Sequence, residues 1–310
     1  MENRSKIATI MTRNTNKVSR RDFIQSATFT LASLGTLGSL NLVAKNRELY
    51  QLSLGVFASY DHASYLKKLG CTYIEESVGG FLLPDGTNST YKKNKAEFND
   101  LKFPIWSYVI LLPPEIKTVG PQANHKAALE RTELALKRAK ECGSSYIVFG
   151  SGGARHIPDG FDRNKAKQQH IELVKQMAPL AEKHGVTIAI EPLNRKETNF
   201  INSLAEGVEI VEAANSPRIQ LLCDIYHMMV EDEPASEIVK YGKYIVHCHI
   251  AEKEERTPPG VKGDDFRPYL GALKQIGYQG GLSIECFKYD DFDKQIKTGL
   301  EVLKQQISEV

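Results

Sequence analysis

Four segments in the second half of the chain each end in a side chain that can bind a metal or transfer a proton. These side chains are Glu191, Asp224, His249 and Glu285. The segments are residues 186–192, 218–224, 244–249 and 282–285. Three carboxylates and one imidazole suit Mn²⁺, Mg²⁺ or Co²⁺ better than a structural zinc ion. Because the segments look like successive strands, the pattern predicts one metal site at one rim of a barrel.

The segment 186–192 indicates how such a side chain is oriented. Ile188 and Ile190 alternate with Thr187 and Ala189, and Glu191 continues the side of the small residues. Successive side chains of a strand point to opposite faces. We therefore expect the isoleucines to face a layer of helices, and Glu191 to face the interior of the barrel.

The segment 244–249 holds two histidines on its inward face, and His249 is the predicted ligand. His247 lies deeper, whereas His249 is nearest the rim and level with the other three ligands. The neighbouring Cys223, Cys248 and Cys286 should point outward and are predicted to be buried free thiols. The chain has five cysteines and no CxxC pair, which does not suggest a disulfide framework.

Strand and helix patterns alternate from residue 50 onward. The four remaining strands are predicted at 52–57, 72–76, 105–111 and 145–149. The helices are predicted at 63–69, 95–101, 126–141, 164–184, 203–214, 235–241, 266–276 and 292–306. Eight strand-helix units imply an α/β protein with a parallel sheet closed into a (β/α)₈ TIM barrel, as one domain over residues 45–310.

Two longer insertions follow the second and fourth predicted strands, at residues 79–93 and 150–163. Both should lie at the carboxyl ends of the strands, where the active sites of such barrels are found. The second insertion is rich in glycine but matches neither a Walker motif nor a dinucleotide fingerprint. We interpret both insertions as loops beside the site.

Residues 1–44 have the layout of a twin-arginine signal peptide. Arg20 and Arg21 precede an uncharged run at 23–44, and Ala44 offers a cleavage point. We therefore expect the twin-arginine machinery to export the protein to the periplasm. A membrane anchor is disfavoured because the run is rich in Gly and Ser. The leader has six basic and two acidic side chains, which leaves residues 45–310 with 34 basic and 36 acidic ones. This net charge of −2 does not favour nucleic acid as a partner.

Short motifs around the four ligands resemble the sugar phosphate isomerase/epimerase superfamily, the xylose isomerase-like TIM barrels. The motifs are Glu191-Pro-Leu-Asn-Arg-x-Glu197, Asp224-Ile-Tyr-His227-Met, His247-Cys-His249 with Arg256 downstream, and Ile284-Glu285. Within the superfamily, the chain is most similar to the D-tagatose and D-psicose 3-epimerases and to hydroxypyruvate isomerase.

The resemblance implies a role for each matching residue. Glu191, Asp224, His249 and Glu285 correspond to the metal ligands, and Glu191 and Glu285 also correspond to the catalytic acid/base pair. The residues implied at the substrate are His227, Arg256 and Glu197, the last as a supporting residue. Glu75 is a further candidate contact at the rim, and Glu76 is equally placed. Mn²⁺ is the expected ion, with Mg²⁺, Co²⁺ and Zn²⁺ as alternatives.

The expected activity is metal-dependent isomerisation or epimerisation of a sugar or keto sugar. One glutamate would remove a proton beside the carbonyl, giving an enediolate, and the other would return a proton. A lyase or hydratase acting on keto sugars or keto glycosides is the alternative. A sugar-binding protein without catalysis and a DNA-repair endonuclease are disfavoured, the latter because no Asp-x-His pair follows His249. The expected partner is a small sugar, and a homo-oligomer is left open.

Overall fold

The computed structural model describes residues 50–82, 86 and 88–310. The predicted signal peptide at residues 1–44 therefore lies outside the described residues. Within the described part of the chain, no helix has the length and apolar character that crossing a bilayer requires.

Eight parallel strands form one sheet in the order β1-β8-β7-β6-β5-β4-β3-β2. A parallel bridge between Phe57 and Glu75 joins the two ends of this order, so the sheet curves into a barrel. The strands are β1 (Ser53–Val56), β2 (Ile74–Ser77), β3 (Ile105–Val109), β4 (Tyr146–Phe149), β5 (Thr187–Ile190), β6 (Ile219–Asp224), β7 (Ile245–Ile250) and β8 (Gly281–Ile284). The predicted TIM barrel is confirmed.

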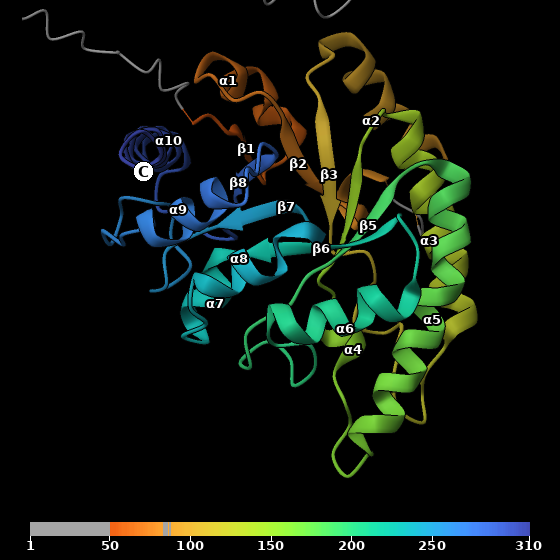
Figure 1. Ribbon diagram of the computed structural model, residues 1–310. Helices are drawn as coiled ribbons and strands as arrows, with labels where there is room; N and C mark the ends of the chain where they lie inside the picture. Colours follow the sequence, from red (N-terminus) through yellow and green to blue (C-terminus); the bar gives the residue numbers. More distant parts are fainter. Residues whose placement is uncertain (1–49, 83–85, 87) are drawn as a thin grey trace, which may run out of the picture. The chain divides into compact units, whose positions relative to one another are not determined.

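Helices follow the strands and cover the outside of the barrel (Figure 1). They are α1 (Ala63–Lys68), α2 (Asn88–Leu101), α3 (His125–Glu141), α4 (Gly152–Arg155), α5 (Arg163–His184), α6 (Leu204–Ala214), α7 (Ile225–Val230), α8 (Ser236–Tyr241), α9 (Arg267–Gln275) and α10 (Phe292–Ser308). Several begin at side chains that accept a hydrogen bond from the first turn, for example Asp162 from Lys165 N at 2.8 Å.

Three helical segments differ from the prediction. Helix α2 begins at Asn88, so it includes residues that were expected to form a loop. The one-turn helix α4 lies in the glycine-rich insertion, and α7 begins directly after Asp224. The Asp224 carboxylate accepts a hydrogen bond from Tyr226 N at 2.8 Å, so this predicted ligand also caps α7.

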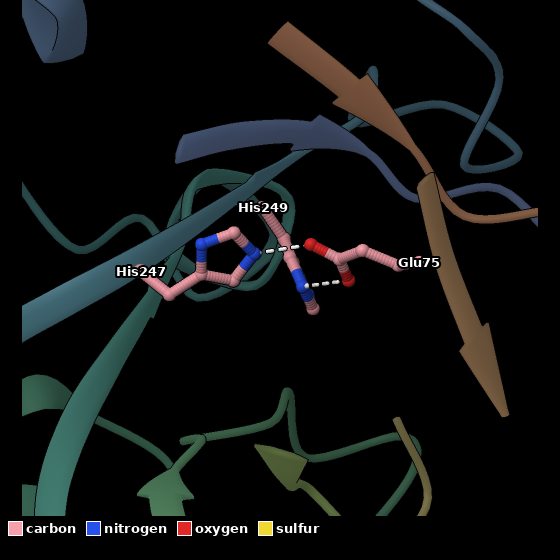
Figure 2. A group of neighbouring side chains, drawn as sticks. All are labelled: Glu75, His247 and His249. Atoms are coloured by element: carbon pink, nitrogen blue, oxygen red, sulfur yellow. Dashed lines mark hydrogen bonds and ion pairs between the residues drawn. The ribbon is translucent and has the colours of Figure 1, made fainter. Parts of the chain in front are cut away.

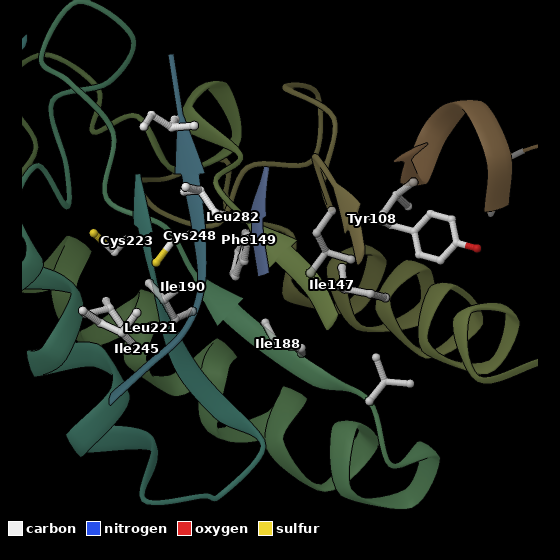
Figure 3. Packing of buried hydrophobic residues seen from close by; sticks show 14 of the residues in the cluster. Tyr108, Ile147, Phe149, Ile188, Ile190, Leu221, Cys223, Ile245, Cys248 and Leu282 are labelled. Carbon is white, nitrogen blue, oxygen red and sulfur yellow. The ribbon is translucent and has the colours of Figure 1, made fainter. Parts of the chain in front are cut away.

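The core follows the alternation expected from β5. Ile188 and Ile190 are fully buried and belong to the large apolar cluster between the strands and the helices. Figure 3 shows outward-facing side chains of β4 to β8 packed together, with Cys223 and Cys248 among them. A smaller, separate cluster consists of Val109, Val148, Ala189 and Leu222. The outward faces of the strands thus pack against the helices, while the inward faces carry this smaller apolar cluster together with the polar residues described below.

Candidate active site

The four predicted metal ligands lie together at the rim formed by the carboxyl ends of the strands, here called the carboxyl rim. Glu191 directly follows β5, Asp224 ends β6 and is paired in register with His249 of β7, and Glu285 directly follows β8. All four side chains are buried. One ligand atom from each residue lies within 4.8 Å of the others. His249 Nδ1 is 3.1 Å from Glu191 Oε1 and 3.2 Å from Glu285 Oε2.

This cluster concentrates negative charge away from water. Two carboxylate oxygens within 4.8 Å of each other repel by at least about 3.5 kcal/mol at an effective dielectric constant of about 20. Burial raises the pKa of Asp224 to about 7, although Arg256 acts to lower it. Burial and the Glu285 carboxylate also raise the pKa of Glu191. The cluster offers three carboxylate oxygens and one imidazole nitrogen, and it carries an excess of negative charge. Both properties fit the binding of a divalent cation.

Arg256 lies over the cluster. Its Nη2 bonds to Glu285 and is 3.3 Å from Asp224 Oδ2, while Nη1 is 3.4 Å from Glu197 Oε1. The guanidinium also stacks on two aromatic rings, 4.6 Å from the ring centre of Tyr226 and 4.7 Å from that of Phe287. The predicted substrate arginine is therefore held beside the predicted ligands.

His227, in the first turn of α7, is oriented by Asn194, a residue of the motif at 191–197 to which the sequence analysis assigns no role. Its Nδ1 accepts hydrogen bonds from Asn194 N at 3.1 Å and Asn194 Nδ2 at 2.9 Å. Burial, together with Arg256, lowers the pKa of His227 well below its usual value, so the ring is neutral. The proton must then be on Nε2, which lies 3.4 Å from Asp224 Oδ2. This N–H has no hydrogen-bond partner among the described residues.

The two remaining candidates, Glu197 and Glu75, lie at different depths. Glu197 is partly exposed, and its Oε1 accepts a hydrogen bond from Asn194 Nδ2 at 3.0 Å. Glu75 is fully buried and bonds to His247 and His249. Glu75 was expected at the rim, but its side chain lies deeper in the barrel, beneath the cluster. Glu76 is also buried, and it bonds to the backbone N–H of Tyr60 and Ser77.

A cavity of about 340 Å³ opens at the cluster. Its polar lining consists of Glu191, Glu197, Arg256, Glu285 and Ser151, and its apolar lining consists of Val109, Ile110, Leu112, Pro114, Leu193 and Phe287. Gly150, Gly152 and Gly153 complete it. Phe287 and Ile110 are 56% and 42% exposed. A polar floor with an apolar wall is typical of sites that bind small molecules.

Two further residues shape the site without a signal in the sequence beyond their place in the second insertion. A Cβ atom on Gly150 would lie 1.7 Å from Glu191 Oε2, so the close approach of Glu191 requires glycine there. Arg155 is fully buried and donates to the carbonyl oxygens of Phe149 at 3.0 Å, Glu191 at 2.6 Å and Phe200 at 3.1 Å. It ties the ends of β4 and β5 to the loop before α6.

The fold is a parallel eight-stranded barrel, and its carboxyl rim holds a cluster of acids, histidines and an arginine. These two features together place the protein among the TIM barrels with a polar site at the carboxyl ends of the strands. The chain belongs to the xylose isomerase-like TIM barrel family, which its residues 63–306 match. The resemblance noted from the motifs is thereby confirmed.

Individual relatives are similar over different parts of the chain. A probable ketose 3-epimerase of Synechocystis is 29% identical over 173 residues, which are 54% of this chain and 58% of that protein. The chain thus spans less than two thirds of this relative. A D-psicose 3-epimerase of Agrobacterium fabrum is 30% identical over 75% of this chain and 84% of its own length. Among solved structures, a 3-keto-D-glucoside 4-epimerase of E. coli superposes with a TM-score of 0.71 at 19% identity, covering 82% of this chain and all of that one.

Proposed function

We propose that the protein is a divalent-metal-dependent epimerase or isomerase of an uncharged ketose. The observation that carries this proposal is the pair Glu191 and Glu285, two buried carboxylates that both line the cavity and both approach His249 Nδ1. The names of the relatives, which include ketose and D-psicose 3-epimerases, support a ketose as the substrate.

The charges around the cavity favour a sugar without phosphate. Among the described residues that line it, Arg256 is the sole cationic side chain, and it is already paired with Glu285 and Asp224. A phosphate dianion would instead face the carboxylates of Glu191, Glu197 and Glu285. Phosphate sites usually supply several unpaired basic groups or backbone N–H groups.

The chemistry follows from the positions of the acid and base groups. A divalent ion held by Glu191, Asp224, His249 and Glu285 would polarise the ketose carbonyl and acidify the adjacent C–H. One of the two glutamates removes that proton, and the other returns a proton to the opposite face, which inverts the carbon. Removal of a proton from the CH₂OH carbon on the other side of the carbonyl gives an aldose instead, when a proton is added to the carbonyl carbon and the hydroxyl proton moves to the former carbonyl oxygen. The Nε2–H of His227 donates to a sugar oxygen, and Arg256 orients a second oxygen.

The test uses Glu285→Gln and a panel of D-psicose, L-ribulose and a 3-keto-D-glucoside in deuterated water. The parent protein should convert at least one of these sugars and incorporate solvent deuterium at the inverted carbon. In the variant, loss of the acid/base oxygen should lower turnover by about 10²–10⁴-fold, with the folded state retained by circular dichroism. Turnover close to that of the parent would exclude the two-glutamate reaction.

A lyase or hydratase acting on keto glycosides is the second candidate. The exposed apolar surface of Phe287 and Ile110 at the mouth of the cavity favours it, because this surface offers contact area for a group beyond the first sugar. Release of the aglycone from the keto glucoside, followed by chromatography, distinguishes this reaction from epimerisation, which leaves the glycosidic bond intact.

A further inference from the structure

A polar layer with no contact to solvent lies beneath the four predicted ligands. It consists of Glu75 on β2, His247 on β7, Ser283 on β8, and Tyr73, and all four residues have a relative exposure of 0%. Figure 2 shows His247 and His249 reaching from the same strand toward the two oxygens of Glu75. A buried carboxylate is costly unless hydrogen bonds satisfy it, so this layer needs an explanation.

The Glu75 carboxylate is the centre of the layer. Its Oε2 lies 3.0 Å from His249 Nε2, and its Oε1 bonds to both His247 Nε2 and Ser283 Oγ. The Ser283 hydroxyl is in turn 2.7 Å from Tyr73 OH. Three donors from two strands of the barrel therefore converge on one carboxylate, which can accept all of them.

The proton positions on the two rings follow from their partners. His247 Nδ1 has no hydrogen-bond partner among the described residues, and Tyr146 stacks on the ring. A buried N–H without an acceptor costs about 1–3 kcal/mol, so the His247 proton belongs on Nε2, where it donates to Glu75. By the same contact, Glu75 accepts the Nε2 proton of His249. His249 Nδ1 faces Glu191 and Glu285 at 3.1 and 3.2 Å and donates to these carboxylates when no cation is bound. A cation held by the cluster would take the place of that proton, and Nδ1 would then present its lone pair.

We propose that Glu75 is a positioning residue for the metal site, which keeps His249 in the tautomer and ring orientation that present Nδ1 to the cation. This inference rests on the metal dependence in the proposed function. A carboxylate behind a ligating imidazole also increases the basicity of the imidazole. His247 and Ser283 hold the carboxylate in place, because each gives it a hydrogen bond from a different strand.

The test measures Mn²⁺ binding by calorimetry in the full chain, without sugar. Glu75→Gln keeps the size of the side chain but replaces one acceptor oxygen by an amide donor. One of the three donors then loses its acceptor, or His249 shifts its proton to Nδ1. We expect Mn²⁺ affinity to fall by about 10–100-fold. The control is Glu76→Gln, the same change one position along β2, where the side chain bonds to Tyr60 N. This control should bind Mn²⁺ as the parent does.

A second variant and a second readout keep the test decisive. Ser283→Ala removes one donor to Glu75 without adding a group, and should weaken Mn²⁺ binding in the same direction by a smaller factor. In Glu75→Gln, raising Mn²⁺ to saturation should restore most of the turnover, because Glu191 and Glu285 are unchanged. A general loosening of the barrel would not be reversed by metal in this way.

Several results would overturn the role of Glu75. They are parental Mn²⁺ affinity in folded Glu75→Gln, an equal loss in Glu76→Gln, or no binding by the parent. Two ions per parent chain would also overturn it, because Glu75, His247 and His249 would then ligate a second cation. A different result would refute the proposed function. If the parent binds Mn²⁺ tightly but converts no sugar, the proposed activity is wrong. A loss of Mn²⁺ affinity in Glu75→Gln would still support the role of Glu75 in that case.

Discussion

Gly150 allows a sharp test of the site, because adding a single methyl group there has a calculable consequence. The Cβ atom of Gly150→Ala would lie 1.7 Å from Glu191 Oε2 and 2.8 Å from Glu191 Cδ, whereas ordinary contacts begin at 3.4 Å. The carboxylate oxygen must therefore move by about 1.7 Å, the difference between 3.4 and 1.7 Å. The backbone is held by Arg155, which bonds to the carbonyl oxygens of Phe149 and Glu191, so the side chain gives way.

Displacement of about 1 Å in an active site can cost about 100-fold in rate. We expect Gly150→Ala to lower kcat/KM for the converted ketose by at least about 100-fold, and to weaken Mn²⁺ binding measured by calorimetry. The control is Gly79→Ala after β2, whose new Cβ would meet its nearest atom, Arg131 Nη2, at 3.9 Å. If Gly150→Ala keeps both parental kcat/KM and parental Mn²⁺ affinity, Glu191 does not act at the position described here.

Three further outcomes are expected. Asp224→Ala removes a ligand and should leave the purified protein with less bound metal in elemental analysis; parental metal content would contradict the ligand assignment. Arg20→Lys combined with Arg21→Lys should keep the protein out of the periplasm in cell fractionation, and an undiminished mature periplasmic form would refute twin-arginine export. Burial raises the pKa of Glu233 from 4.5 to about 7, so the folded state binds this proton more tightly than the unfolded state, and the contribution of this group to stability falls as pH rises from about 4.5 to about 7. Glu233→Gln removes this loss while its oxygen can still accept from Leu204 N, so its Tm should exceed that of the parent more at pH 8 than at pH 5.

The fold could be predicted where the side chains of one strand alternate between the layer of helices and the interior of the barrel. In β5, Ile188 and Ile190 pack outward and Ala189 packs inward, as the alternation indicates. The start of α2 was not predictable in this way, because Tyr91 is its only buried residue and no apolar stripe marks the first turns. Helix α7 was not predicted because it has only six residues and begins directly after β6. No turn or loop residues separate the strand pattern from the helix pattern at Asp224.

The clustering of the four predicted ligands could be foreseen because strand order and strand ends are properties of the local sequence. The parallel register then brings them to one level, as the pairing of Asp224 with His249 shows. Asn194, Arg155 and Glu75 act through contacts between distant segments, which spacing along the chain does not reveal. Glu75, for example, reaches His249 across a separation of 174 residues.

The loop that positions Arg256 shows how the site obtains rigidity from a residue outside the cavity. Glu252 is fully buried, and its Oε1 accepts hydrogen bonds from the backbone N–H groups of Gly260 and Gly263, both at 2.8 Å. Glu255 and Arg256 have positive φ angles of 60° and 52°, a conformation that costs about 1–3 kcal/mol per residue. Such backbone persists only where its surroundings enforce it. The bonds to Glu252 on one side and the contacts of the guanidinium with Glu285 and Asp224 on the other provide that enforcement. Arg256 is therefore preorganised above the cluster, and a substrate need not supply the free energy to order it.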